Sequence, residues 1–248
     1  CGFFQPFLPY KGVLFMKISD TKKLAAITAA FFITVTAFSG CSESANSSQT
    51  TSSVSQAAKS DIDASIAAED IDVGYDEESS VGIRFADGSA AIDSEGATAE
   101  GETVTISQAG TYILSGTATN GRIIVSADKT AEIKLIFNGV DITCADNAPL
   151  LVSKAKKVYI VLEDGTENVL TDSASYSLGE DDSNTDGAIF SKADLTINGS
   201  GTLTVNANYK HGIVSKDDLV ITDGNINVTS ASTAMEGKDS VKISGGKF

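Results

Sequence analysis

Several residue types that carry chemistry are scarce in this sequence of 248 residues. It contains one histidine, three cysteines, three prolines and no tryptophan. A site with several histidine ligands therefore cannot be assembled from this chain. No nucleophile motif accompanies His211 to suggest a Ser-His-Asp triad, so we expect it to be a turn residue.

Cysteine is too scarce for a disulfide framework. Cys1 lies upstream of the natural start that we infer below, and Cys41 is assigned below to a lipid anchor. Only Cys144 then remains in the folded part, and we expect it to be a small buried hydrophobic residue. The fold must therefore hold without disulfide bonds.

Positive charge is also in short supply. The chain has 18 Lys and Arg against 33 Asp and Glu, a formal charge of −15; from Cys41 onward the balance is 14 against 32, or −18. An acidic surface repels phosphate backbones, so nucleic acid is excluded as an expected partner.

The N-terminal part has the features of targeting and tethering sequence. Residues 1–15 precede Met16, and we interpret them as a non-native segment. Residues 16–40 resemble a bacterial lipoprotein signal, with early lysines and an apolar run shorter than the roughly 20 residues of a spanning helix. Cys41 is then the predicted lipidation site, the alternatives being an ordinary cleaved signal or an uncleaved anchor. Residues 41–79, rich in Ser, Ala and Asp, predict a flexible tether.

Three segments near the C-terminus restate one another. They are Phe190–Ile197, Val214–Ile221 and Glu236–Ile243, spaced 24 and 22 residues apart. Each joins a polar turn to an apolar-polar-apolar strand and, after it, a glycine turn. Period-two alternation places Leu, Ile and Val on one face, which must lie inside.

Two earlier segments fit the same template. Ile133–Phe137 aligns with Val158–Leu162, one repeat further along the chain. Strands that recur at a period of roughly 22 to roughly 25 residues, with no helical pattern between them, predict an all-β solenoid, a parallel β-helix over residues 80–248. Residues 81–116 are expected to supply the cap and first coil. Because Phe248 falls in mid-coil, we expect the solenoid to be C-terminally truncated.

One coil carries an insertion rich in carboxylates. Val158 and Leu195 are 37 residues apart, and the excess falls within residues 171–187, which include Asp181, Asp182 and Asp186. Ca²⁺ takes about six to eight oxygen ligands and suits a flexible acidic loop. The loop predicts a calcium site, with a merely solvated loop as the alternative.

The repeat also predicts columns of charge. Lys192, Lys216 and Lys238 share a repeat position, and Lys154 lies one residue out of register; the aspartates pair in two rows, Asp217 with Asp239 and Asp194 with Asp218. Like charges opposed on neighbouring strands are unfavourable, so the rows invite either Ca²⁺ or the adjacent lysines. The lysine column is expected to contact an anionic polymer, and a salt-bridged polar turn is the alternative.

The stretch Asp186–Ala207, followed by His211–Leu219, resembles the clostridial β-helical cellulose- and acid-sugar-binding proteins. The resemblance extends over residues 80–248. It implies a right-handed parallel β-helix of pectate-lyase type, bound Ca²⁺ and a carbohydrate-binding rather than catalytic role. The family's Asp-Gly-Ile is replaced here by His211-Gly212-Ile213, which weakens any calcium site at that position.

We therefore predict non-catalytic, calcium-assisted binding of plant cell-wall polysaccharide by a monomer, extracellular and anchored to the bacterial cytoplasmic membrane only through lipid. Acidic glycans such as polygalacturonate are favoured over cellulose, because the chain lacks tryptophan for a flat aromatic platform. A calcium-dependent polyuronate lyase and a structural adhesin are the alternatives. The predicted ligand-binding residues are Lys154, Lys192, Lys216, Lys238 and Tyr209, and the predicted metal ligands are Asp181, Asp182, Asp186, Asp194, Asp217, Asp218 and Asp239.

Overall fold

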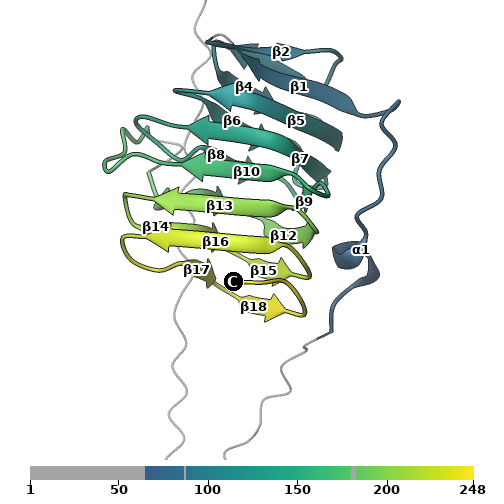
Figure 1. Ribbon diagram of the computed structural model, residues 1–248, viewed down its shortest axis with the longest axis vertical. Coiled ribbons are helices and arrows are strands. Elements are labelled where there is room, and N and C mark those ends of the chain that lie inside the picture. Colours follow the sequence, from purple (N-terminus) through teal and green to yellow (C-terminus); the bar gives the residue numbers. More distant parts are fainter. Residues whose placement is uncertain (1–64, 87, 180–182) are drawn as a thin grey trace, which may run out of the picture. The chain divides into compact units, whose positions relative to one another are not determined.

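The structure, a computed structural model, describes residues 65–86, 88–179 and 183–248 (Figure 1). It is nearly all-β, with a single short helix, α1 (Ala68–Ile71), in the described part. No helix among these residues is long and apolar enough to cross a membrane. The predicted segments 1–15 and 16–40 and the predicted lipidation site Cys41 lie outside the described residues.

The strands form two mixed sheets, of eleven and seven strands. Only β1–β2 and β3–β4 pair antiparallel among the described strands, and every other pair is parallel. The larger sheet contains β1 (Val81–Ala86), β2 (Ser89–Ile92), β5 (Gly110–Ala118), β7 (Glu132–Thr143), β9 (Lys157–Leu162), β10 (Glu167–Thr171), β12 (Asp194–Gly199), β13 (Thr202–Ala207), β15 (Asp218–Ile221), β16 (Asn225–Ser230) and β18 (Ser240–Ile243). The smaller sheet contains β3 (Ala97–Glu100), β4 (Thr103–Ile106), β6 (Arg122–Ser126), β8 (Leu150–Lys154), β11 (Gly187–Ser191), β14 (His211–Ser215) and β17 (Met235–Gly237).

The strand register follows the alignments predicted from the sequence. Leu195 of β12 lies opposite Leu219 of β15, which lies opposite Val241 of β18. Ile133 and Val158 are likewise paired, and Val158 pairs across the insertion with Leu195. The antiparallel pairs at the N-terminal end make the sheets mixed rather than wholly parallel. The closed, right-handed helix stays a prediction.

One continuous core holds the sheets together. It takes every second residue of the strands, so that Leu195 and Ile197 of β12 are buried with Leu219 and Ile221 of β15. Full burial of such a side chain stabilises the fold by about 1.5–3 kcal/mol. Cys144 is buried and free, as predicted from the sequence.

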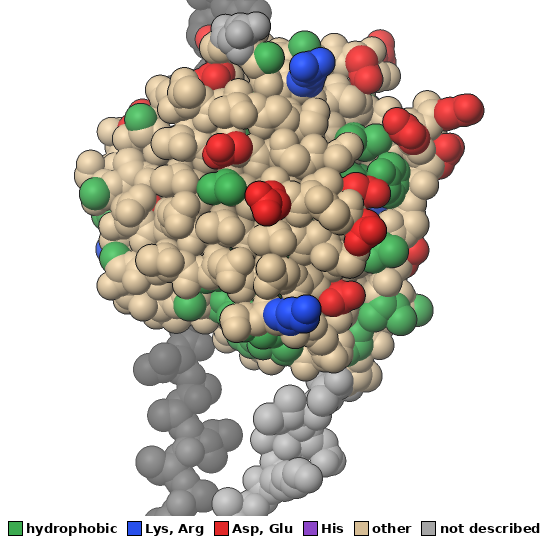
Figure 2. Space-filling view, viewed as in Figure 1, with side chains coloured by type: hydrophobic (Ala, Val, Ile, Leu, Met, Phe, Trp, Pro, Cys, Tyr) green, Lys and Arg blue, Asp and Glu red, His purple; other side chains and the backbone are tan. Residues whose placement is uncertain are grey.

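The outward positions of β10, β13 and β16 carry ladders of threonine and asparagine. Asn206 donates to the Thr171 hydroxyl over 3.1 Å, and Asn225 donates to Thr202 over 3.3 Å. Figure 2 shows this face, on which Lys and Arg are sparse and acidic side chains gather toward the right-hand edge. Neighbouring strands on this face are thus joined mainly by uncharged hydrogen bonds.

An N-terminal segment, residues 68–75, crosses the outside of the larger sheet; we call it the strap. The sequence predicted a tether as far as residue 79, but the structure packs Asp70 of the strap against β12 with only 4% of its surface exposed. The docking depends on polar contacts with Lys157, Thr196 and Asn198. Composition does not reveal contacts of this kind, because a segment poor in apolar residues is interpreted as unfolded.

The acidic insertion is fixed at its start by Asp172, which is buried. Its carboxylate accepts the Tyr176 hydroxyl over 2.5 Å and the backbone N–H of Asn208, and its carbonyl accepts from the Asn208 amide. Burial raises the pKa of Asp172 in spite of these hydrogen bonds. This aspartate therefore ties the insertion to the turn after β13.

Gly199 lets β12 lie close to β9. It has a φ of +89° and pairs with Leu162, whose carbonyl oxygen a Cβ at position 199 would overlap. Gly139 has a similar φ of +76°, but a Cβ there would meet nothing within 4 Å. Substituting each glycine in turn therefore distinguishes two free-energy costs, that of the left-handed backbone conformation and that of the close approach between β9 and β12.

We predict that Gly139→Ala lowers the free energy of unfolding by about 1–2 kcal/mol, the cost of a left-handed conformation for a residue with a Cβ. Gly199→Ala should cost about 1–3 kcal/mol more, since the backbone of β9 must shift. Urea unfolding of both variants measures the difference. Equal losses would show that the close approach of β9 and β12 does not need glycine.

A second prediction concerns Asp172. Because its pKa is raised in the folded protein, ionisation is disfavoured there, and its contribution to stability falls as pH rises from the unfolded value through the folded one. Asp172→Asn cannot ionise, so its free energy of unfolding relative to the parent should improve across that window and then level off. Urea unfolding from pH 3.5 to 7.5 tests this, and a difference independent of pH would contradict it.

Candidate functional site

A groove with a volume of 610 Å³ lies outside β11, β14 and β17. Its floor contains Phe190 of β11, whose side chain points away from the main core and is fully buried. The acidic insertion forms one wall, so the predicted insertion lies at the groove. The lining residues are Leu178, Ser183, Asn184, Thr185, Asp186, Phe190, Lys192, Tyr209, Lys210, Lys216 and Lys238.

Three lysines of the predicted column line this groove. Each follows a strand of the smaller sheet and is fixed by a backbone hydrogen bond to the strand before: Lys192 to Val152, Lys216 to Ser191 and Lys238 to Ser215. Strands in a sheet are about 4.8 Å apart, so successive ammonium groups can be held at a short, regular spacing. The structure therefore places Lys192, Lys216 and Lys238 in one column, as the sequence predicted.

Acidic groups at the groove hold the middle lysine. The Lys216 ammonium is 3.6 Å from Asp186 Oδ1 and 3.7 Å from Glu236 Oε1. His211 Nε2 is 3.9 Å from the other oxygen of Asp186, and its Nδ1 accepts the backbone N–H of Thr233. Asp186 thus faces the Lys216 ammonium and the His211 ring, and His211, which opens β14, also supports the neighbouring turn.

Two buried polar atoms of the groove have no hydrogen-bond partner among the described residues. They are Thr185 Oγ1 and Asp186 Oδ1. Buried polar atoms in native proteins are nearly always paired with protein or ordered water. Both residues line the groove, and the Lys216 ammonium, 3.6 Å from Asp186 Oδ1, balances the charge of that carboxylate.

An aromatic platform borders the groove. The Tyr209 ring stacks on Tyr176 with centroids 4.3 Å apart and an interplanar angle of 25°, and the Lys210 ammonium lies 4.8 Å from the Tyr209 centroid. Lys216 lies 5.1 Å from the Phe190 centroid in the same way. Aromatic faces next to ammonium groups provide both an apolar surface and positive charge.

The remaining predicted ligand residue is elsewhere. Lys154 ends β8 opposite Ser126, is exposed, and is not among the residues lining the groove. The sequence had placed it one residue out of register with the other lysines. The pairing of β6 with β8 shifts here, from Val125 opposite Val152 to Ser126 opposite Lys154, so Lys154 does not continue the column.

The predicted metal ligands are divided among several places. Asp181 and Asp182 lie outside the described residues, and Asp186 lies in the groove. Asp194 accepts the N–H of Asp218, whose carboxylate accepts the Ser240 hydroxyl and lies 3.7 Å from Lys242. The second row is stacked through its backbone, since Asp239 N–H donates to the carbonyl of Asp217.

Crowding of carboxylates is evident at Asp217, whose pKa is raised by burial and then by Asp194 and Asp239. Residues 65–86, 88–179 and 183–248 nevertheless contain no group of three or more His, Cys, Asp or Glu able to hold a metal ion. The described carboxylates alone do not fit Ca²⁺, because most of them already face protein donors or cations. Calcium stays a prediction.

Sequence reasoning missed several groove residues. Lys210 and Thr185 do not stand out by spacing. Phe190 opens the first repeated segment, and the unbroken apolar run Ala188-Ile189-Phe190 signals a strand buried on both faces, but the repeat did not predict Phe190 as a groove residue. Lys210 follows the predicted Tyr209 directly but occupies no repeat position. It reaches the groove because the turn after β13 borders the insertion.

Residues 100–248 match the family model described as carbohydrate-binding domain-containing protein. A relative of that description from Acetivibrio thermocellus is 45% identical over 126 residues. The match covers 50% of this chain and 44% of the relative, so the chain spans less than half the length of the relative it matches.

A solved structure is also similar. It is described as the gadolinium derivative of the polysaccharide lyase-like protein from C. thermocellum, with a TM-score of 0.61 and 32% sequence identity. The match covers 67% of this chain and 80% of that one. Since the family model covers more than half of the sequence, the chain belongs to the family of carbohydrate-binding domain-containing proteins.

Proposed function

We propose that this protein binds an acidic polysaccharide in the groove without cleaving it. The observation that carries the proposal is the gathering of four lysines and one aspartate around a single groove in a chain whose formal charge is −15. Three of these lysines are held in a column by the strand register. A regular row of ammonium groups is complementary to a polymer with one carboxylate per sugar.

The rest of the groove suits a sugar ring. The Tyr209 ring is held by Tyr176 and can stack against a sugar face. The volume of 610 Å³ lies within the range of about 300–1,000 Å³ typical of ligand sites.

We interpret the stacked strands as coils of a right-handed parallel β-helix anchored at the bacterial surface through Cys41. The parallel pairing of each strand with the strand one repeat further along the chain supports the solenoid part of this proposal. A groove running across successive coils would suit an extended polymer. The monomeric state and the surface location remain predictions from the sequence.

A polyuronate lyase is the second candidate, because the similar solved structure is named polysaccharide lyase-like. Retention on immobilised polygalacturonate without a rise in absorbance from unsaturated uronates would support binding alone. A rise in absorbance would establish a lyase. A protein that is neither retained nor active would fit the structural adhesin, and retention on cellulose in place of polygalacturonate would contradict the acidic ligand.

We predict that the triple change Lys192→Gln, Lys216→Gln and Lys238→Gln weakens binding of polygalacturonate at least about tenfold, since three favourable charge contacts are lost. The matched control changes Lys129, Lys154 and Lys247 to Gln, which alters the net charge equally outside the groove. Titration calorimetry compares the two. An equal loss in both would reduce the effect to net charge and remove the groove from the proposal.

Calcium is tested separately. Since the lysines already supply positive charge, we expect chelation to lower retention on polygalacturonate only in part, and added Ca²⁺ to restore it. Metal analysis before and after chelation measures the bound ion directly. Unchanged retention on polygalacturonate by calcium-free protein would contradict the calcium prediction. Complete loss of retention after chelation would show that the metal, rather than the lysine column, is the main determinant of binding.

A further inference from the structure

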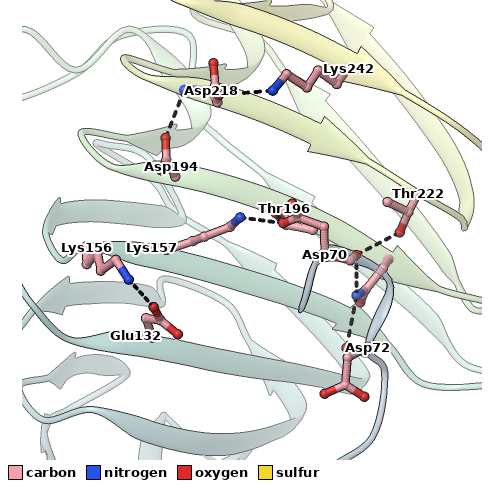
Figure 3. A network of polar contacts seen from close by, with 11 residues as sticks. Asp70, Asp72, Glu132, Lys156, Lys157, Asp194, Thr196, Asp218, Thr222 and Lys242 are labelled. Carbon is pink, nitrogen blue, oxygen red and sulfur yellow. Dashed lines mark hydrogen bonds and ion pairs between the residues drawn. The ribbon is translucent and has the colours of Figure 1, made fainter. Parts of the chain in front are cut away.

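The strap binds the larger sheet through two carboxylates. Asp70 Oδ1 lies 2.5 Å from the Lys157 ammonium and accepts the Thr196 hydroxyl over 2.5 Å. Asp72 Oδ2 lies 3.1 Å from the Lys134 ammonium. Figure 3 shows Asp70 beside Lys157 and Thr196, with Asp72 further along the strap. Two acids of one short segment are thus each held by a lysine of the sheet.

The face beneath the strap carries a mixed set of side chains. In the outward row, Lys134 of β7 lies opposite Tyr159 of β9, which lies opposite Thr196 of β12. The Lys157 ammonium is 5.1 Å from the Tyr159 ring centroid. Burial, followed by nearby carboxylates, raises the pKa of Tyr159 to about 12, so its hydroxyl is a donor at neutral pH. Ammonium, ring and hydroxyl groups are the partners that a sugar acid needs.

The strap gains little from hydrophobic burial. Ile71 and Val73 are 60% and 48% exposed, whereas Asp70 is buried. Apolar area removed from water gives only about 25 cal/mol per Å², so these two side chains contribute little to docking. Apart from the Tyr75 hydroxyl, which donates to Glu163 over 3.1 Å, the segment is held by its carboxylates and backbone carbonyls, which another anion could replace.

The fit between strap and sheet is also incomplete. Asn198 donates to the carbonyls of Asp70 and Asp72, yet its own Oδ1 is buried without a hydrogen-bond partner among the described residues. A buried, unpaired oxygen costs free energy. A sugar hydroxyl can donate to it, and the strap segment does not.

We infer that the outward face of β7, β9, β12 and β15 is a second binding site for carboxylate-bearing saccharides, and that the strap occupies this site with Asp70 and Asp72 in place of ligand. A ligand must displace the strap. Its apparent association constant is therefore the intrinsic constant multiplied by the small fraction of molecules in which the strap is open. The inference rests on the proposed function only for the choice of an acidic sugar as probe.

The test uses the full chain with the groove disabled by the Lys192, Lys216 and Lys238 substitutions, and trigalacturonate as the probe. Adding Asp70→Asn and Asp72→Asn should lower the dissociation constant for trigalacturonate about tenfold, which lies within the usual range of coupling between two sites. Adding Lys134→Gln and Lys157→Gln to that variant should abolish the gain. Because the three groove lysines are substituted in every variant of this experiment, a negative result would count against the second site and not against the proposed function of the groove.

The matched control is Glu78→Gln with Glu100→Gln, two exposed acids whose loss changes the net charge equally. An equal gain in this control, or no gain in the Asp70 and Asp72 variant, would overturn the inference. Circular dichroism confirms that each variant is folded.

A second measurement leaves the strap sequence intact. In the groove-disabled protein, millimolar trigalacturonate should increase hydrogen exchange at the backbone amides of α1, because Asp70 is buried against β12 only while the strap is docked, and displacement exposes this turn to water. Unchanged exchange at these amides would show that the strap is a fixed part of the fold, which also overturns the inference.

Discussion

Parallel backbone pairing between strands that lie one repeat apart in the sequence is the constraint on which the rest of the structure depends. Each strand satisfies its hydrogen-bonding groups only through the strand before and after it, as in the series β9, β12, β15 and β18. A shift of one residue would turn every core side chain outward. The register shifts within two pairs, between Leu114 and Gly116 and between Val125 and Ser126, but the series β9, β12, β15 and β18 stays aligned, and even the long insertion before β11 leaves Val158 opposite Leu195.

This constraint converts single residues into columns. Lys192, Lys216 and Lys238 follow three successive strands of the smaller sheet, and the backbone holds them in line. The same geometry places Asp194 beside Asp218, where the cost of opposed carboxylates is relieved by hydrogen bonds from the Asp218 N–H and the Ser240 hydroxyl. The lysine column borders the groove, where Lys216 also faces Asp186 and Glu236. The aspartate row and the lysine column, both aligned by the strand register, therefore have different surroundings.

The register, the lysine column and the buried Cys144 could be predicted from the sequence because they depend on short-range pattern. The groove was anticipated only in part. Lys154 was predicted as a ligand-binding residue one residue out of register with the column, and it does not line the groove, since the β6–β8 pairing shifts at Lys154. Phe190 is held in register between Leu151 and Val214, but its place under the groove depends on which segments border the smaller sheet, and Lys210 was missed because it occupies no repeat position.

The strap was missed for a different reason. Hydrophobic pattern identifies segments that bury apolar side chains, but here Asp70 is buried while Ile71 faces solvent. The partners of Asp70 lie far along the chain, on β9 and β12, and nothing local to residues 68–75 identifies them. Polar docking to a distant sheet is thus outside the reach of sequence pattern.

The strap also fixes an order of events in folding. Its contacts with the sheet join residues 60 to 152 positions apart, whereas neighbouring strands pair over much shorter separations. Closing long loops costs more entropy and is slower, and the surface that receives the strap exists only once β7, β9, β12 and β15 are stacked. The strap is therefore synthesised before the strands that it contacts but docks after them. Its docking reports that these four strands have assembled.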